Sequence, residues 1–226
     1  MIGVYDYTVI LTYCSVLSAC LGIFISLNDA GHPYIGVMLL MVCGLCDTFD
    51  GRVARAKKNR TKREKDFGVQ IDSLSDLLAF GVLPTCIGIA LYRRDMFVGG
   101  ESFLAHIPFG VILVISALFI LCALIRLAWF NVTVEETQGD SLGEEKYYYG
   151  LPVTTTALIF PTFLLIRHFV CLNITFIYYI LLILVGILFI LKFKLKKPKS
   201  KGIYLMVLAG AIEFLIVLVI KLMTKH

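Results

Sequence analysis

The chain has 226 residues, of which 59% are apolar and only 16% are charged, and its formal net charge is +5. Its mean hydropathy of +0.87 excludes a soluble globular domain, because a domain of this length needs more polar residues to cover its surface. A lipid bilayer accepts such apolar surface. The composition therefore predicts an integral membrane protein, with one domain over residues 1–226.

Seven apolar runs are long enough to cross a bilayer as helices, which takes about 17–25 residues each. In chain order they cover residues 7–27, 34–50, 68–92, 107–130, 151–171, 172–191 and 203–223. The second run is short and ends in charged residues, so we expect its end to lie in water or beside a wet cavity. The sequence thus predicts an all-α polytopic membrane protein.

Lys and Arg gather in the loops that follow the even-numbered runs. Eight lie between residues 52 and 65 and six between residues 192 and 201. With Lys146, these loops hold 15 of the 21 Lys and Arg residues. Since basic loops stay on the cytoplasmic side, we expect the N-terminus in the cytoplasm. An odd number of spans then places His226 on the opposite side.

Four aspartates lie within or beside two neighbouring apolar runs, where ionisable groups are costly and usually functional. Asp47 and Asp50 are three residues apart at the end of the second run, and Asp72 and Asp76 are four apart near the start of the third. Each spacing places a pair on one helix face. Because the second run exits and the third enters on the same side, we expect all four carboxylates to meet at one depth.

Clustered carboxylates in a low dielectric repel one another unless cations neutralise them. Ligand sets made only of oxygen favour Mg²⁺, Mn²⁺ or Ca²⁺ over zinc, and two ions about 3.5–4 Å apart suit displacement at phosphorus. Pairing with the arginines of the adjoining loop is the alternative, which explains one pair more readily than two. A divalent-cation transporter is a further alternative, although the other runs offer no acidic route onward.

The residues around the aspartates form a recognisable pattern. Gly51, Ala54 and Gly68 lie where larger side chains would crowd a ligand between helices. With Arg55 and the aspartates they read D-x-x-D-G-x-x-A-R, a spacer, then G-x-x-x-D-x-x-x-D. This resembles the signature of the CDP-alcohol phosphotransferase family at all eight positions. The spacer, residues 56–67, is longer than usual in that family, and we interpret the additional residues as a longer cytoplasmic loop.

The resemblance implies a six-helix membrane core, with residues 203–223 as an additional C-terminal helix, assembled as a homodimer. It implies two divalent cations, Mg²⁺ or Mn²⁺ with Ca²⁺ as a further option, held by Asp47, Asp50 and Asp72. Asp76 would complete the metal site and act as general base on an acceptor hydroxyl. The residues implied for binding the CDP-linked lipid are Thr12, Asp47, Gly51, Ala54, Arg55 and Gly68.

Two later stretches bear on the acceptor: RLAWFN at residues 126–131 and YGLP at residues 149–152. Both are similar to the branch of the family that uses serine. The implied reaction transfers the phosphatidyl group of CDP-diacylglycerol to the hydroxyl of L-serine, giving phosphatidylserine and CMP. Arg126 suits the serine carboxylate through bidentate pairing, and Asn131 can supply polar contacts. Alternatively, Arg126 reaches lipid phosphates or pairs with an aspartate.

The rival acceptors are phosphorylated alcohols such as glycerol 3-phosphate or inositol phosphate, for which the basic loop could supply cations. The distribution of Lys and Arg predicts an active site facing the cytoplasm, and we expect a bacterial-type cytoplasmic membrane. The partners implied by the resemblance are CDP-diacylglycerol, L-serine and membrane lipids, and not nucleic acid.

Two other features have structural interpretations. Cys43 and Cys46 are the only close pair among seven cysteines. Without a nearby histidine, we expect buried small hydrophobes rather than a zinc or redox pair. Glu213 lies inside the last apolar run, where we expect a helix–helix hydrogen bond or an interface role rather than catalysis.

Overall fold

The structure is a computed structural model that describes residues 3–28, 32–98, 107–137, 147–170, 175–196 and 200–223. Its longer helices are α1 (Ile10–Leu27), α2 (Pro33–Ala56), α3 (Lys62–Asp76), α4 (Leu83–Val98), α5 (Phe109–Thr137), α6 (Thr156–Val170), α7 (Thr175–Ile190) and α8 (Ser200–Met223). A π-helical segment, η1 (Leu77–Val82), joins α3 to α4, and a 3₁₀ turn, η3 (Val153–Thr155), precedes α6. Two short strands, β1 (Tyr147–Tyr149) and β2 (Lys194–Lys196), are the only strands in the described ranges.

Each of the seven apolar runs overlaps at least one of these helices. The third run falls within a continuous rod, because α3, η1 and α4 follow one another without a break. Within the described residues, four helical segments are long and apolar enough to cross a membrane, and three shorter apolar helices cover Val153–Ile166, Thr175–Ile190 and Val207–Val219. The prediction of an all-α polytopic membrane protein is confirmed.

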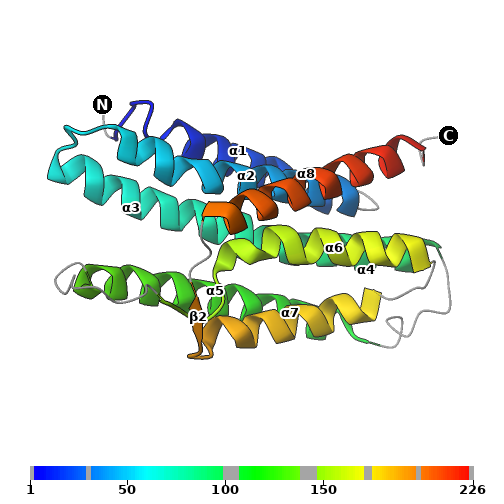
Figure 1. Cartoon of the computed structure of the whole chain (residues 1–226). Coiled ribbons are helices and arrows are strands. Elements are labelled where there is room, and N and C mark those ends of the chain that lie inside the picture. The colour runs from blue at the N-terminus through cyan, green and yellow to red at the C-terminus, as the bar shows by residue number, and fades with distance from the viewer. Residues whose placement is uncertain are drawn as a thin grey trace.

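The connections that follow the even-numbered runs lie toward the same end of the helices (Figure 1). The α2–α3 turn lies at the end where α1 begins, and α8 ends toward the opposite end. After α5 and α7, the strands β1 and β2 pair antiparallel, with Tyr148 opposite Leu195. The described parts of the basic connections thus share one end, as the charge distribution predicts. Lys146 lies outside the described residues.

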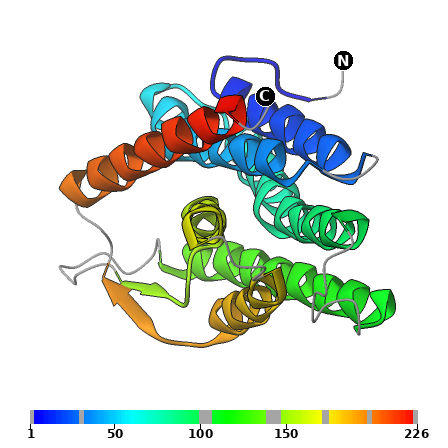
Figure 2. The ribbon, with the colours of Figure 1, turned by 90° about the vertical axis from the view of Figure 1, so that its right-hand side faces the viewer.

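The helices form two groups around a shared core. Figure 2 shows α1, α2 and α8 on one side of the molecule and α5 and α7 on the other. The core between them includes Phe80 of η1, Leu83 of α4 and Phe160 of α6, all fully buried. Outward-facing side chains such as Leu17 and Val114 are more than half exposed, as expected for helices that contact lipid.

Close contacts fix the helices that support the polar end of the molecule. A Cβ atom at Gly44 of α2 would lie 2.5 Å from the Cβ of Ala157 in α6, so these helices meet almost backbone to backbone. The buried hydroxyl of Tyr178 in α7 donates a 2.7 Å hydrogen bond to the carbonyl of Pro84 in α4. Both α2 and the rod containing α4 are therefore held by several neighbours.

The segment between the second and third runs is not the long loop that the sequence led us to expect. Only five residues, 57–61, separate α2 from α3. Thr61 and Glu64 form a capping box: the Thr61 hydroxyl accepts from the Glu64 amide at 3.2 Å, and the Glu64 carboxylate accepts from the Thr61 amide at 2.7 Å. Because this motif satisfies the first amides of a helix, the additional residues lengthen α3 instead of a loop.

The structure buries Cys43 as expected but leaves Cys46 partly exposed, and it gives Glu213 a partner on another helix. The thiol of the buried Cys43 donates to the carbonyl of Ser15 at 3.4 Å, and Cys43 and Cys46 are both free. Thr162 of α6 donates a 2.6 Å hydrogen bond to the carboxylate of Glu213 in α8. The expected helix–helix hydrogen bond of Glu213 is confirmed.

Candidate active site

The carboxylates of three aspartates, from two helices, lie close together. Asp47 and Asp50 lie one turn apart on α2, and Asp72 lies opposite them on α3. Each offers a carboxylate oxygen within 4.8 Å of the other two. Asp50 is only 8% exposed, and neither Arg55 nor Arg60 forms a salt bridge to the group. Arg60 of the α2–α3 turn therefore does not neutralise it, and three oxygen donors this close fit a hard divalent cation.

Asp76 is the last residue of α3, one turn beyond Asp72. It is 9% exposed and lies outside the group of three aspartates. The π-helical η1 starts immediately after it, and such irregularities in helices often occur at functional sites. The structure thus brings three of the four predicted carboxylates together and places Asp76 further along the rod.

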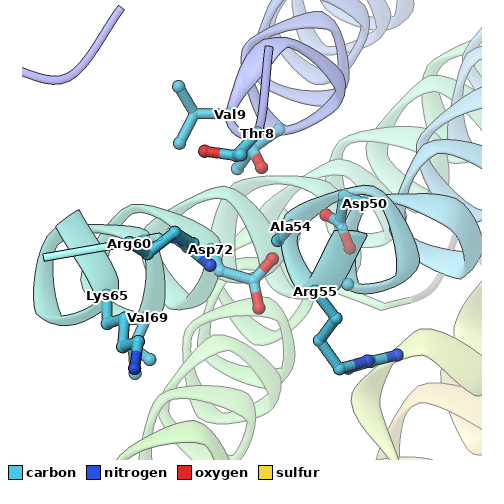
Figure 3. Close-up of a pocket in the computed structure, with 12 residues that line it drawn as sticks. Thr8, Val9, Asp50, Ala54, Arg55, Arg60, Lys65, Val69 and Asp72 are labelled. Carbon is cyan, nitrogen blue, oxygen red and sulfur yellow. The ribbon is translucent and has the colours of Figure 1, made fainter. Parts of the chain in front are cut away.

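An open pocket borders the cluster (Figure 3). Asp50 and Asp72 line it, together with five residues that the sequence resemblance implied for the CDP-linked lipid: Thr12, Gly51, Ala54, Arg55 and Gly68. Asp47, the remaining one of that set, is not in the lining. Residues spread over 60 positions of the sequence, on three helices, therefore converge on one hollow beside the aspartates.

Five lining residues were not among those predicted for the site: Thr8, Val9, Arg60, Lys65 and Val69. The capping motif at Thr61 contains the signal that could have found two of them. A helix that starts there places Lys65, Val69 and Asp72 at spacings of four and three residues, on one face. No comparable local signal marks the residues before α1.

The segment before α1 is held against the α2–α3 turn. The Lys57 ammonium donates to Asp6 at 2.6 Å and to Glu64 at 2.9 Å, and the amide and hydroxyl of Thr8 also donate to Asp6. These hydrogen bonds, the one from Lys57 above all, lower the pKa of Asp6 to about 2. An ionised Asp6 therefore fixes the segment that supplies one wall of the pocket.

Two signature glycines make room for guanidinium groups. A Cβ atom at Gly51 would lie 3.2 Å from Nη1 of Arg55, and a Cβ atom at Gly68 would lie 2.6 Å from Nη2 of Arg60. The Arg60 Nη2 also donates a 3.0 Å hydrogen bond to the carbonyl of Glu64. The small residues thus do more than leave space for a ligand, because arginine side chains occupy part of that space.

The two residues predicted for the acceptor lie on α5, outside the pocket lining. The Asn131 amide donates a 2.8 Å hydrogen bond to the hydroxyl of Ser73, which directly follows Asp72 on α3. Arg126 is 6% exposed, and its Nε donates to the carbonyl of Leu151 at 3.1 Å. Asn131 therefore contacts the aspartate-bearing helix. Arg126 contacts the segment that leads into α6 and forms no salt bridge with an aspartate among the described residues.

These observations define an integral membrane protein with a three-carboxylate site for divalent cations, opening on a pocket that also contains Arg and Lys side chains. A comparison with known families agrees with this class. Residues 8–223 match the profile of the CDP-alcohol phosphatidyltransferase family, and the chain belongs to this family. Members of the family generally depend on divalent cations, and the aspartate cluster fits that requirement.

Several curated relatives are named CDP-diacylglycerol–serine O-phosphatidyltransferase. The protein of that name from Saccharomyces cerevisiae is 39% identical over 133 residues, which cover 58% of this chain and 42% of the yeast protein. The protein from Helicobacter pylori is 29% identical over 157 residues, covering 69% and 55%. The protein from Methanocaldococcus jannaschii is 30% identical over 201 residues, covering 89% and 77%. The chain thus spans about half the length of the yeast and Helicobacter relatives.

Proposed function

We propose that this protein transfers the phosphatidyl group of CDP-diacylglycerol to the hydroxyl of L-serine, giving phosphatidylserine and CMP. The observation that carries the proposal is the cluster of Asp47, Asp50 and Asp72 beside a pocket lined by the other signature residues. The names of the relatives support serine as the acceptor. Serine carries no phosphate of its own, so every phosphate at the site would come from the CDP-linked lipid.

In this proposal Asp47, Asp50 and Asp72 would hold two divalent cations, Mg²⁺ or Mn²⁺. When bound, such cations balance the charge of the carboxylates and stabilise negative charge that develops on the diphosphate. Thr12, Gly51, Ala54 and Gly68 would shape the pocket around the CDP group. Arg55, which also lines the pocket, would add positive charge beside the diphosphate.

Asp76 is the proposed general base. It would accept the proton of the serine hydroxyl as the hydroxyl oxygen forms a bond to the phosphorus of the phosphatidyl group. The bond from that phosphorus to the oxygen of CMP breaks, and CMP leaves with the electron pair. Burial of Asp76 beside η1 supports this role, because it separates the carboxylate from bulk water.

Asn131 and Arg126 are the proposed contacts for serine. The Asn131–Ser73 hydrogen bond supports the first, since Ser73 directly follows Asp72. For Arg126, the guanidinium has further N–H groups beyond the Nε that bonds to Leu151. These groups could pair with the serine carboxylate. Arg126→Ala is then expected to raise the KM for serine far more than the KM for CDP-diacylglycerol.

The charge distribution supports an active site on the cytoplasmic side. The described basic connections share one end of the helices, and Asp47 and Asp50 lie in the half of α2 that leads to that end. Family resemblance supports a homodimer, which light scattering of the detergent-purified protein would test by its mass. The relatives include a yeast, a bacterium and an archaeon, so a bacterial-type membrane stays a prediction.

A turnover assay tests the acceptor. The purified chain is incubated with CDP-diacylglycerol and Mn²⁺ or Mg²⁺, and CMP release is measured with serine, glycerol 3-phosphate or inositol phosphate. Serine alone is expected to support release. Release with a phosphorylated alcohol but not with serine would overturn the acceptor assignment.

Matched variants test the residues. Asp72→Asn is expected to weaken Mn²⁺ binding by roughly 100-fold or more, at least the cost of losing a group that only supports a metal ligand. Asp66→Asn, at an exposed position of the same helix, is the control and should bind normally. Asp76→Asn is expected to retain Mn²⁺ binding and lose roughly 10²–10⁴-fold in turnover. Unchanged turnover would remove Asp76 from the mechanism.

A further inference from the structure

The pocket contains two sets of opposite charge that do not neutralise each other. Asp50 and Asp72 belong to one set, and Arg60 and Lys65 belong to the other, in addition to Arg55 of the signature. Figure 3 shows both basic side chains on one side of Asp72, with Asp50 on the other side. Neither basic residue forms a salt bridge with a described residue. Each set is therefore available for a ligand of its own.

Arg60 is held in a defined position. Its Nη2 donates to the carbonyl of Glu64 at 3.0 Å, and the side chain passes over Gly68, where a Cβ atom would lie only 2.6 Å from the same nitrogen. Its Nε is buried and has no hydrogen-bond partner among the described residues. A buried guanidinium nitrogen without a hydrogen-bond partner is costly, and an anion would satisfy it.

The early start of α3 positions Lys65 beside the pocket. The capping box of Thr61 and Glu64 fixes the first turn, so that Lys65 lies one turn before Val69 and two turns before Asp72, on the same helix face. All three residues line the pocket. The part of the chain that lengthens α3 therefore supplies positive charge to the aspartate site.

We infer that Arg60 and Lys65 form an anion site for the diphosphate of the CDP-linked lipid, opposite the aspartates that would hold the cations. This inference rests on the proposed function. A diphosphate is favoured over a phosphate on the acceptor because the cationic residues line the same pocket as Asp50, Asp72 and the remaining signature residues. An extended diphosphate can meet carboxylate-bound cations on one side and a guanidinium on the other.

Binding of CDP, a soluble probe, to the full purified chain in the presence of Mn²⁺ tests the inference by calorimetry. Arg60→Gln is expected to raise the Kd for CDP roughly 10-fold or more, the loss of a charge-assisted hydrogen bond. Lys65→Gln, at an exposed position, is expected to raise it roughly 3-fold. Arg63→Gln and Lys62→Gln are the matched controls, since both residues are exposed on the first turn of α3 and outside the pocket lining.

Further measurements separate binding from structure. Arg60→Lys should recover part of the affinity, and the thermal midpoint of the ligand-free Arg60→Gln protein should stay within a few degrees of the wild type. A Kd for CDP that Arg60→Gln and Arg63→Gln change equally would overturn the inference. So would weakened binding of glycerol 3-phosphate with unchanged binding of CDP, because the anion would then belong to an acceptor. A wild-type chain that binds no CDP would instead overturn the proposed function.

Discussion

Replacing Gly68 by alanine separates two explanations for this glycine. The added methyl carbon would lie 2.6 Å from Nη2 of Arg60, whereas an ordinary contact is about 3.5 Å. The guanidinium must therefore move by about 1 Å. That movement breaks its 3.0 Å hydrogen bond to the Glu64 carbonyl and takes it out of its position in the pocket.

The expected cost to folding is small. Loss of the Arg60–Glu64 hydrogen bond costs about 1 kcal/mol, and alanine in place of glycine within a helix gains up to about 1 kcal/mol. The two effects nearly cancel, so the thermal midpoint should change little. CDP binding should still weaken, because the displaced guanidinium no longer lies in the pocket. We expect the Kd for CDP to rise roughly 10-fold, or about 1.4 kcal/mol.

Combining Gly68→Ala with Arg60→Gln shows whether the methyl group acts through the arginine. If it does, adding Gly68→Ala to Arg60→Gln leaves the Kd for CDP nearly unchanged, since the displaced group is already absent. If the methyl group blocks the nucleotide directly, the two effects multiply to roughly 100-fold, and the explanation through Arg60 is refuted. Gly110→Ala, where a Cβ atom meets nothing within 4 Å, is the control.

Three further substitutions test other contacts. The pKa of Asp6 is about 2, below its ordinary value of 3.8, so its hold on the N-terminal segment is present above about pH 4 and lost as the pH falls toward 2. The protection of the Thr8 amide against hydrogen exchange, relative to an unfolded chain at the same pH, should fall over that range in the wild type. Asp6→Asn should remove this change in protection, and identical protection profiles for the two proteins would contradict the prediction. Gly44→Ala should destabilise the fold by roughly 1–3 kcal/mol through overpacking between α2 and α6, and an unchanged thermal midpoint would exclude the close contact. Thr162→Val should cost about 0.6–1.7 kcal/mol by leaving Glu213 without its interhelical partner, which thermal unfolding in detergent would show.

The aspartate cluster could be predicted because its signals are local and periodic. A spacing of three or four residues defines a helix face, and two successive spans that exit and enter on one side must bring their polar ends together. Asp47, Asp50 and Asp72 followed this logic. Asp76 shares a helix face with Asp72, but its oxygens lie outside the group that the other three carboxylates form. Helix spacing alone could not predict that difference.

The remaining features depend on signals that a search for apolar runs does not detect. The first turns of α3 are polar, so their hydropathy resembles that of a loop, although the Thr61–Glu64 capping motif marks a helix start. The contact between Asp6 and Lys57 joins residues 51 positions apart, which no local pattern reveals. The π-helical turn at Leu77–Val82 likewise depends on how η1 packs against its neighbours.

The length of the rod formed by α3, η1 and α4 has a consequence for how substrate reaches the protein. The 35 residues from Lys62 to Met96 extend roughly 50 Å as a helix, whereas the hydrocarbon layer is about 30 Å thick. The basic first turns of α3 must therefore stand at the height of the lipid headgroups. A CDP-linked lipid would arrive by lateral diffusion with its diphosphate already at that height, and its tails would never leave the bilayer. Turnover should then follow the mole fraction of that lipid in the membrane or micelle rather than its bulk concentration.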